Sequence, residues 1–409
     1  MTPRLEHKIF WPALVAISVV LVVRNHSRLV RITWPPHVIC LFALLAFCGA
    51  SVLWAFKPEF ALTRFILQAM MVTSIVLPGM LADRTADMMR GVFLCFAFAS
   101  TLNIFFVLNQ PPMLYENGEM FGYPGYFSIK GTLGECAALT FLLSLHEMLY
   151  PGRRRVVGII VAVIAISLIF PSHSKGSLAV AIIAPFAAGL TLIVGKKMRI
   201  SPAIVLLPIP LCFEILSHIP GVNIINRISW YAYSNYTLSG RTVIWDFVRY
   251  ELGRKPLLGW GFNSFWQVGA DGPSIVEGPG WVKQMPSGHS GYWDMALDLG
   301  YVGYPLLIIF IIATLHALGR VADRDPTRAW LLLSLALFII IINMIESVWM
   351  RGQDMQWLLF LILVAEIGRY WGPFPPDGHS RHRRYFGVPS SRDGAPGVAP
   401  KHLTKRLNR

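Results

Sequence analysis

Long apolar runs recur along the chain and are separated by short polar segments. A helix needs about 20 residues to cross a hydrocarbon layer of about 30 Å, and most of the runs approach this length. The pattern therefore predicts an all-α polytopic membrane protein, with residues 1–373 as its membrane domain. We expect eleven spans, give or take one: Phe10–Val23, His37–Phe56, Phe65–Ala82, Gly91–Asn109, Thr132–Tyr150, Val156–Phe170, Ser177–Val194, Ile200–Ile219, Leu299–Leu318, Ala329–Ile345 and Gln356–Tyr370.

The segment from Ile219 to Ser290 is too long to be an ordinary connection between spans. Loops of this length are usually functional or disordered, and this one is rich in Trp, Tyr and Phe, which suits a folded structure near the lipid headgroups. We therefore expect residues 220–290 to form an ordered loop. An interfacial helix is predicted from Arg241 to Leu252, ended by Gly253.

Two faces are predicted for this interfacial helix. An apolar face should lie on the bilayer and a cationic face should line an external cavity. The two faces consist of Val243, Phe247 and Tyr250, and of Arg241, Trp245 and Arg249. Beyond the helix, the Gly/Pro-rich stretch from Gly269 to Gly288 is expected to act as a mobile lid, and a further helix should begin at Ser290 or Gly291.

Composition and charge add orientation to this picture. Hydrophobic residues make up 55% of the chain and charged residues 14%, against about a quarter in soluble proteins. Lys and Arg gather in alternate short loops, which should face the cytoplasm, so residues 220–290 should lie on the other side. An odd number of spans leaves the helix count and the side of the amino terminus open. The basic loops hold Arg24, Arg28 and Arg31; Arg153–Arg155; Lys196, Lys197 and Arg199; and Arg320, Arg324 and Arg328.

The carboxyl-terminal residues 374–409 carry eight Lys or Arg and two Asp among many Pro, Gly and Ser residues. This composition predicts a basic, disordered cytoplasmic tail near anionic headgroups. No recognition module accompanies the charge, so we do not expect nucleic-acid binding. The five cysteines all fall in apolar spans, and the chain has no Walker loop, dinucleotide fingerprint, HExxH or CxxC. We therefore expect neither a metal nor a cofactor.

Arg241 and His289 are the residues of the long loop that best suit chemistry. Arginine offers a fixed fork of donors that matches phosphate oxygens, and histidine can accept a proton from a sugar hydroxyl near neutral pH. Each residue also has an ordinary interpretation. An arginine at a bilayer surface often only anchors a helix, and a histidine in a Gly/Ser loop often has no catalytic role, so the residues alone leave both interpretations open.

A set of motifs narrows this choice. Leu238–Trp245 and Lys255–Trp266 are followed by Gly288–Asp294 and by Leu297–Gly300. Together they resemble the signature loop and the His-containing segment of the O-antigen ligase-like family. Weaker similarities lie upstream, and in all the resemblance covers roughly Gly49 to Tyr370. The upstream segments are Leu53–Pro58 and Gly125–Lys130.

The resemblance implies an inverting glycosyltransferase of the GT-C type, which uses undecaprenyl-diphosphate-linked glycans at the periplasmic face of the bacterial inner membrane without a metal. Arg241 would then hold the diphosphate, and His289 would act at the acceptor hydroxyl as a general base or orienting group. The family usually has an arginine where this chain has Lys175, which keeps the charge without the fork. Its usual Lys-Asn pair is Lys130–Gly131 here, which leaves Lys130 as an electrostatic contributor to diphosphate binding.

Five further residues are expected to support this site. Asp294 and Asp298 lie one helical turn apart beyond His289 and should orient it or pair with Arg241, with a structural role preferred. Glu346 and Arg351 flank the last short external loop. Their default role is a mutual ion pair, with substrate contact as the alternative. The fifth supporting residue is Arg249, which shares a helical face with Arg241.

Three functions remain in competition. The His-Ser-Gly-Tyr sequence at His289 and the segment Gly278–Trp281 more closely resemble members that polymerise exopolysaccharide or O-antigen repeat units, so a polymerase is preferred, with a chain-length regulator as a potential partner. The alternative within the family is a ligase that transfers glycan to lipid A-core. The alternative from another class is a lipid-linked glycan flippase, which predicts cationic residues inside many spans. The sugar, the linkage and the oligomeric state stay open.

Overall fold

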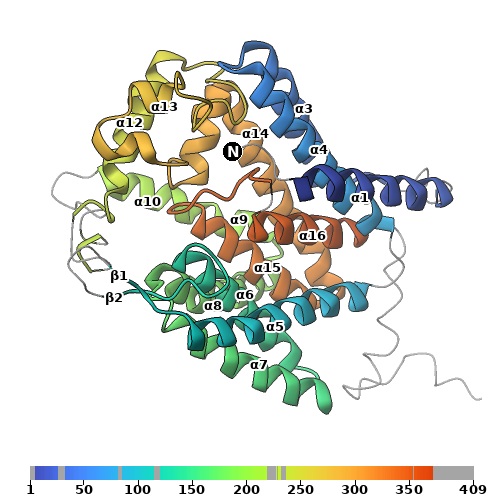
Figure 1. Ribbon diagram of the computed structural model, residues 1–409. Helices are drawn as coiled ribbons and strands as arrows, with labels where there is room; N and C mark the ends of the chain where they lie inside the picture. The colour runs from blue at the N-terminus through green and yellow to red at the C-terminus, as the bar shows by residue number, and fades with distance from the viewer. Residues whose placement is uncertain are drawn as a thin grey trace, which may run out of the picture.

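The computed structural model describes residues 5–25, 33–81, 85–114, 120–218, 227, 229–231, 236–352 and 354–371. Helices make up most of this part of the chain (Figure 1). The tail at 374–409, the start of the long loop at 219–226, and the basic residues Arg28 and Arg31 lie outside the described residues. The first half consists of α1 (Leu5–Arg24), α3 (Pro36–Ala50), the 3-10 helix η1 (Ser51–Trp54), α4 (Pro58–Leu81), α5 (Thr85–Asn109), the strands β1 (Met113–Leu114) and β2 (Met120–Gly122), α6 (Lys130–Met148) and α7 (Arg153–Ile169).

The second half contains the long loop and three helices after it. The two short strands of the first half pair antiparallel and are the one sheet found among the described residues. The elements are α8 (Lys175–Met198), α9 (Pro202–Leu206), α10 (Pro208–His218), α12 (Arg241–Arg254), α13 (Pro273–Val276), the 3-10 helix η2 (Gly280–Gln284), α14 (Gly291–Arg324), α15 (Pro326–Ile342) and α16 (Met355–Arg369).

Among the described residues, five helical segments are long and apolar enough to cross a membrane: Pro36–Trp54, Pro58–Leu81, Met88–Asn109, Lys175–Met198 and Gly291–Arg324. Shorter apolar helices occur at Ile9–Arg24, Pro202–Cys212 and Pro326–Ile342. Each predicted span overlaps a helix of the structure. The chain is therefore all-α in the described part, with several helices able to span a bilayer, as the apolar pattern predicts.

Proline and aspartate set several of the helix boundaries. Pro36, Pro202 and Pro326 each lie at the start of a helix, where the missing N–H removes no helical hydrogen bond. Asp354 caps α16 because its carboxylate accepts from the backbone N–H groups of Gln356 and Trp357. These boundaries explain where the apolar runs become separate helices.

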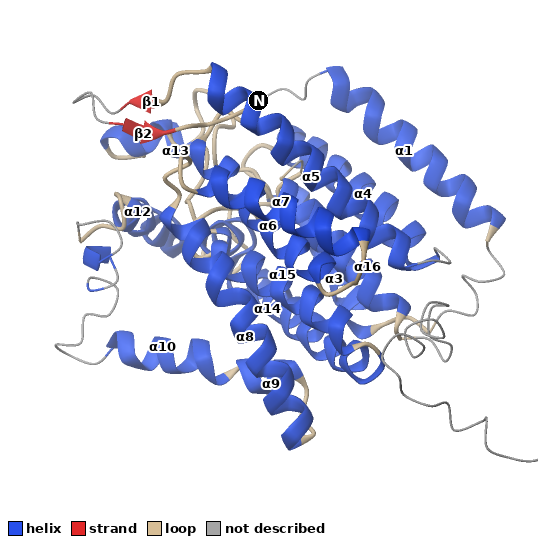
Figure 2. Ribbon diagram, turned by 90° about the horizontal axis from the view of Figure 1, so that it is seen from below, coloured by secondary structure: helices blue, strands red, loops and turns tan. Residues whose placement is uncertain are grey.

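The predicted span Ile200–Ile219 is not one continuous helix. It is divided into α9 and α10 at Leu207 and Pro208, since a proline cannot donate the next helical hydrogen bond and its ring clashes with the preceding turn. Figure 2 shows α10 lying apart from the main bundle. The proline therefore breaks what the hydropathy pattern treats as a single span.

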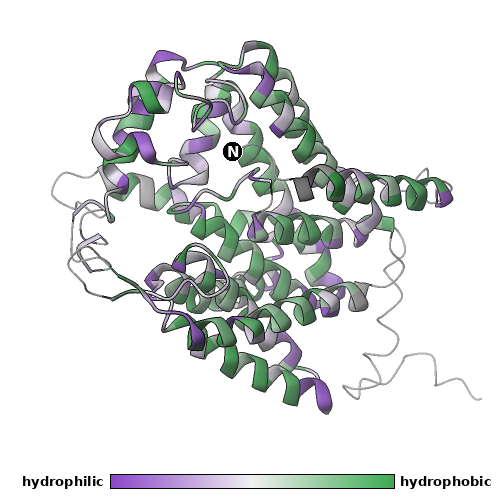
Figure 3. Cartoon of the chain, in the orientation of Figure 1, coloured by the Kyte–Doolittle hydropathy of each residue, from purple (hydrophilic) through white to green (hydrophobic). Residues whose placement is uncertain are grey.

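The largest core lies where α14, α15, α16 and α3 meet. Phe310, Phe338 and Phe360 are fully buried there, and the core continues into α4, α6 and α8. The helices of this bundle are strongly apolar, whereas polar residues are more frequent around α12 and α13 (Figure 3). The structure thus consists of an apolar bundle and a more polar region built on one of its ends.

A second, smaller core holds α12 against the start of α14. Its buried members on α12 are Ile244, Phe247, Val248 and Leu252, which pack with the aromatic residues Trp260, Phe265 and Trp266. Of the apolar face predicted for α12, Phe247 packs into this core, whereas Val243 and Tyr250 are exposed, as residues in contact with a bilayer would be. The face of Ile244 and Val248 packs against those aromatic side chains. The helix ends at Arg254 rather than before Gly253.

The segment from Pro256 to Gly261 is fastened to α14 by backbone hydrogen bonds. Trp260 and Gly261 donate to the carbonyl groups of Leu297 and Asp298, each at 2.9 Å. In return, Tyr301 and Val302 donate to those of Pro256 and Leu257, at 2.8 and 3.1 Å. The expected second helix and the following span are thus one element, α14, with a kink between them.

Two glycines make this close approach possible. Gly259 and Gly300 both have positive φ angles, 67° and 64°. A Cβ on Gly259 would lie 2.5 Å from the carbonyl oxygen of Leu297, and one on Gly300 would collide with that of Leu257. Only glycine allows two backbones to approach in this way without strain. The kink of α14 at Gly300 (φ 64°, ψ −172°) lies at this contact.

The junction between α3 and α4 packs against the same segment. Ser51 Oγ accepts from the N–H of Phe262 at 2.9 Å, and Trp54 Nε1 donates to the carbonyl of Leu258 at 2.9 Å. The N–H of Lys57 donates to Ser264 Oγ at 2.7 Å. Leu53–Pro58 and Lys255–Trp266, two segments that the sequence singles out, are therefore in contact although about 200 residues separate them.

Candidate functional site

Arg241 is the first residue of α12 and is held from three directions. Its Nη2 donates to Oε1 of Glu346 at 2.7 Å, its Nε to the carbonyl of Ile345 at 2.8 Å, and its Nη1 to that of Leu238 at 3.2 Å. The side chain is 15% exposed. The guanidinium is therefore fixed in one orientation while part of it remains accessible.

The backbone before Arg241 is strained. Leu238, Ser239 and Gly240 have φ angles of 49°, 58° and 88°. A left-handed conformation costs a non-glycine residue roughly 1–2 kcal/mol, and such strain tends to persist where the surrounding structure enforces it, often at functional sites. Here the three residues turn the chain so that α12 begins with Arg241 facing Glu346.

His289 lies on the other side of the same carboxylate. Its Nδ1 is 3.3 Å from Oε2 of Glu346, and its side chain is 31% exposed. The φ angle of His289 is 48°, again left-handed for a residue with a side chain. Glu346 thus connects Arg241, at the start of α12, with His289, just before α14. We name these three residues the Glu346 bridge.

The electrostatics of the Glu346 bridge favour an ionised carboxylate. Burial acts to raise the pKa of Glu346, but the hydrogen bond with His289 and the charge of Arg241 outweigh it and hold the pKa below the ordinary value of a glutamate. A carboxylate that stays charged attracts the proton on Nδ1 of His289, which leaves Nε2 of that ring as the acceptor.

The loop from Asn343 to Asp354 places Glu346. The N–H of Gly291 donates to the carbonyl groups of both Asn343 and Glu346, each at 2.9 Å. The side chain of Asn343 accepts from the N–H groups of Val348 and Trp349 at 3.1 and 3.0 Å. The start of α14 and this loop are therefore one hydrogen-bonded unit, which fixes the carboxylate relative to His289.

Asp294 and Arg351 form the ion pair next to the Glu346 bridge. Arg351 Nη2 lies 3.1 Å from Asp294 Oδ2, and Asp294 Oδ1 accepts from the N–H of Gly288 at 2.8 Å and from Trp266 Nε1 at 2.9 Å. The default pairing of Glu346 with Arg351 is therefore wrong. Asp294 is the partner of Arg351 because it lies one turn into α14, directly behind the backbone of Gly288, and it fixes the segment that carries His289.

Asp298 and Arg249 lie away from the Glu346 bridge. Asp298 Oδ2 accepts from the N–H of Asn263 at 2.8 Å, so it holds the Pro256–Trp266 segment on α14. Arg249 pairs with Asp246 at 2.9 Å on an exposed face of α12 and lies over the ring of Trp293. The structure thus gives both residues partners other than Arg241 and His289.

Lys130 and Lys175 form a second cationic group. They are the first residues of α6 and α8, and their charges are close enough to interact. Lys130 Nζ donates to the carbonyl of Phe121 at 2.7 Å and lies over that ring, while Lys175 is exposed. A Cβ on Gly134, one turn into α6, would touch Ser174 and Ser172, so the two helix starts are in contact.

Glu135 connects the two groups and is a residue that the sequence analysis misses. It is buried in α6, only 8% exposed, and it interacts electrostatically with Arg241 and Glu346. Glu135 lies in the first turns of α6, which begins at Lys130. A carboxylate inside the apolar run Thr132–Tyr150 is the signal that identifies it, because ionisable residues at membrane depth are usually functional.

The stretch predicted to be a mobile lid is folded in the structure. It contains α13 and η2, and its Val282 is fully buried. Asp271 forms an ion pair of 2.7 Å with Lys57 at the start of α4, and the ring of Trp281 lies against Gly240. These contacts connect the stretch to both the bundle and the residue that precedes Arg241.

The chemistry that these groups can perform follows from their types. Arg241, Lys130 and Lys175 offer positive charge to an anion, and His289 offers a nitrogen for proton transfer. No group of three or more His, Cys, Asp or Glu side chains suited to a metal ion occurs in the part of the chain that the structure describes. The geometry suits charge stabilisation and proton transfer at one location.

No protein-family model and no curated protein matches this sequence.

Proposed function

We propose that the protein is a membrane glycosyltransferase that polymerises undecaprenyl-diphosphate-linked repeat units, and the Glu346 bridge is the observation that carries this proposal. Arg241 and His289, which the family resemblance assigns to diphosphate binding and to the acceptor, are joined by the two oxygens of one carboxylate. One carboxylate thus holds both Arg241, which can bind phosphate, and His289, which can accept a proton. Two such groups within reach of a single substrate suit a transfer reaction.

In the proposed reaction, an acceptor hydroxyl oxygen attacks the anomeric carbon of the donor glycan. The new bond forms as the bond from that carbon to the diphosphate oxygen breaks, and the diphosphate leaves with the electron pair. The hydroxyl proton passes to Nε2 of His289, while the Nδ1–H group donates to Glu346. Attack from the face opposite the leaving group inverts the anomeric centre.

The cations stabilise the charge that develops on the diphosphate. Three of the five N–H groups of Arg241 are engaged with Glu346, Ile345 and Leu238. The other two can reach phosphate oxygens, and the fixed orientation means that little reorganisation is needed during the reaction. Lys130 and Lys175 add charge from the starts of α6 and α8.

The finer architecture belongs to the same proposal. We place the described helices in eleven spans of a GT-C-like fold in the bacterial inner membrane, with α12, α13 and the Glu346 bridge on the periplasmic side. The buried arginines lie at the ends of helices rather than in the middle of spans, which supports an enzyme over a flippase. Arg328 and Arg369 are buried, but they lie at the ends of α15 and α16 and pair with Glu366.

Reconstitution tests the proposal. The full chain is placed in vesicles with a lipid-linked repeat unit, and products are separated by length. We expect Arg241→Ala and His289→Ala each to lower transfer by about 10²–10³, the usual effect of losing a charge-stabilising or proton-transferring group. Arg153→Ala, an exposed arginine at the start of α7, is the matched control and should keep wild-type activity.

The products separate the competing functions. Glycans longer than one repeat unit support the polymerase, and glycan attached only to added lipid A-core supports the ligase. Movement of the donor across the bilayer without a new glycosidic bond supports the flippase. Full activity of both the Arg241 and the His289 variants would overturn the assignment of the site.

A further inference from the structure

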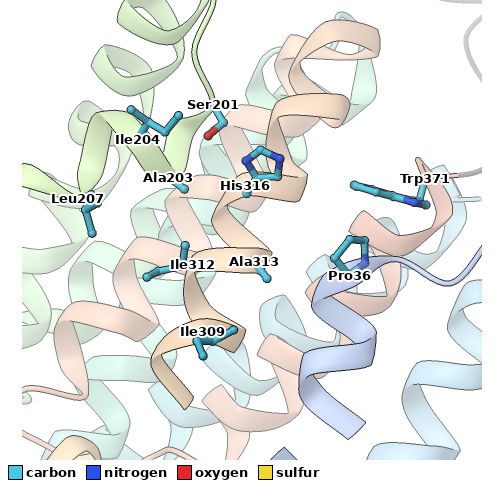
Figure 4. A pocket seen from close by; sticks show the side chains of 10 residues that line it. All are labelled: Pro36, Ser201, Ala203, Ile204, Leu207, Ile309, Ile312, Ala313, His316 and Trp371. Atoms are coloured by element: carbon cyan, nitrogen blue, oxygen red, sulfur yellow. The ribbon is translucent and has the colours of Figure 1, made fainter. Parts of the chain in front are cut away.

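A cavity of about 300 Å³ lies between α9, α14 and the first residue of α3. Its lining is almost entirely apolar, with Ile204 from α9, Leu207 just after α9, and Ile309, Ile312 and Ala313 from α14. Figure 4 shows these side chains around one space, with Ser201, His316 and Trp371 at its edge. The volume is at the lower end of the range for small-molecule pockets, roughly 300–1,000 Å³.

The cavity opens to the outside of the helix bundle. Ile204, Leu207 and Ile309 are each about half exposed, at 54%, 47% and 50%. They belong to helices that are apolar enough to lie in a membrane, and in a bilayer the opening would face hydrocarbon rather than water. An apolar molecule can therefore enter from the bilayer without crossing an aqueous phase.

Positive charge surrounds one end of this cavity. Arg320 is one turn beyond His316 on α14, and it stacks on the ring of Trp371 at 3.6 Å and donates to its carbonyl at 3.2 Å. Lys197 and Arg199 are exposed and immediately precede Ser201 on the other side. A Cβ on Gly319 would approach Pro202 and Ser201, so α9 and the end of α14 are in contact here.

The cavity is separate from the Glu346 bridge. His289 precedes the first residue of α14, whereas His316 lies near the other end of that helix, up to roughly 35 Å further on at a rise of about 1.5 Å per residue. The basic residues at its edge belong to loops that the charge pattern assigns to the cytoplasmic side. The cavity is thus outside the site that the proposed transfer reaction uses.

We propose that this cavity binds an anionic phospholipid of the cytoplasmic leaflet. One acyl chain occupies the apolar space between α9 and α14, and the phosphate lies between Arg320 and the Lys197–Arg199 segment. Arg320 supplies the fork of donors that matches phosphate oxygens, and Trp371 holds that fork at the level of the headgroups. Basic pockets between membrane helices on this side are known as lipid headgroup sites. This inference does not depend on the proposed transferase activity.

Native mass spectrometry of the full chain tests the inference. The protein is extracted in a non-ionic detergent and titrated with phosphatidylglycerol or with phosphatidylcholine of the same acyl chains. We expect one phosphatidylglycerol to bind with at least about tenfold preference, because the choline group of phosphatidylcholine cancels the net negative charge that the basic residues attract. Arg320→Gln should lower this binding by about the same factor, and Ile312→Trp should abolish it by filling the space.

Arg153→Gln is the matched control, because it removes one exposed positive charge from another loop of the same predicted side. It should leave binding unchanged. Arg320 is exposed, so its variant reports on binding even if Ile312→Trp lowers stability. Equal retention of both lipids, or unchanged phosphatidylglycerol binding in Arg320→Gln, would overturn the proposal. Displacement of the bound lipid by substoichiometric undecaprenyl phosphate would also overturn it.

Discussion

The Nδ1 atom of His289 lies 3.3 Å from Oε2 of Glu346, and the other oxygen of that carboxylate holds Arg241. The histidine and the glutamate come from opposite sides of a hydrogen-bonded unit formed by the start of α14 and the loop after α15. A histidine oriented by a carboxylate is a common means of fixing a tautomer for proton transfer. The proposed activity should therefore depend on Glu346 as strongly as on the two residues that it joins.

Glu346→Gln should lower glycan transfer by about 10²–10³ in reconstituted vesicles, in the range for loss of a group that supports acid–base catalysis. The amide cannot ionise, so it no longer stabilises a protonated His289 and no longer balances the charge of Arg241. The loss should appear mainly in kcat. Glu59→Gln, which replaces an exposed glutamate at the start of α4, is the control. Wild-type kcat in Glu346→Gln would contradict a catalytic role for the bridge.

Arg241→Lys should be nearly as harmful as Arg241→Ala, although the charge is kept. The arginine donates to three acceptors in different directions, Glu346, Ile345 and Leu238, and an ammonium group cannot span them and a diphosphate at once. We expect transfer to fall by about 10²-fold. A lysine variant with more than half of the wild-type rate would show that charge alone is required.

Asp294→Ala should destabilise the protein by about 1.5–3 kcal/mol, typical of losing a hydrogen bond to a charged group. Its carboxylate accepts from Gly288, Trp266 and Arg351, and the residue is 7% exposed. Asp294→Asn keeps an acceptor for the first two and should lose less stability. Thermal unfolding in detergent measures both variants, and a wild-type unfolding temperature for Asp294→Asn would contradict the role of the ion pair.

Gly300→Ala should destabilise the contact between α14 and the Pro256–Gly261 segment by more than about 2 kcal/mol, since the methyl group meets a carbonyl and φ is positive. Gly253→Ala is the matched control. A Cβ on Gly253 meets no atom within 4 Å, and the residue is helical, so this variant should gain up to about 1 kcal/mol. Urea or thermal unfolding of both variants checks the difference.

Glu251 should make stability fall as the pH rises. Burial, followed by the charge of Glu277, raises the pKa of Glu251 to about 7 despite its contact with Arg254. The folded state therefore binds a proton more tightly than the unfolded state, and this stabilisation is complete below the ordinary glutamate pKa and is lost as the pH rises towards 7. The slope is at most about 1.4 kcal/mol per pH unit.

Glu251→Gln measures this contribution. The amide does not titrate, so unfolding temperatures of the variant should change less between pH 4.5 and 7 than those of the wild type. Glu277 is exposed to a greater extent, with 35% of its side chain accessible, so Glu277→Gln should have a smaller effect. An unaltered pH profile in Glu251→Gln would show that the buried carboxyl stays ionised throughout.

Much of the fold follows from the apolar pattern, because burial in lipid and burial in protein require similar residues. The pattern locates a helix at each expected span. It does not predict the break between α9 and α10, since Pro208 acts through backbone geometry rather than hydropathy. It also does not predict the face of α12 that packs on protein, because Ile244 and Val248 pack against Phe265 and Trp266, which come from later in the chain.

The sequence likewise predicts some residues of the candidate site and not others. Arg241 and His289 stand out in the sequence, since their residue types and motifs point to phosphate and proton chemistry. Their common partner, Glu346, does not, because an ion pair with the nearby Arg351 is the simpler expectation along the chain. In the folded protein, Asp294 pairs with Arg351, and Glu346 instead contacts Arg241 and His289. Glu135 is marked in the sequence only as a carboxylate inside an apolar run, and its electrostatic interaction with Arg241 and Glu346 depends on the folded structure.

The interlock between Gly259 and Gly300 joins the parts of the protein that carry Arg241 and His289. It fastens α12, the Pro256–Trp266 segment and the start of α14 into one packed unit. Lys130 and Lys175 stand at the starts of α6 and α8, whose buried residues belong to the larger core. The proposed substrate would therefore be held between the interlocked unit, through Arg241 and His289, and the first residues of two bundle helices.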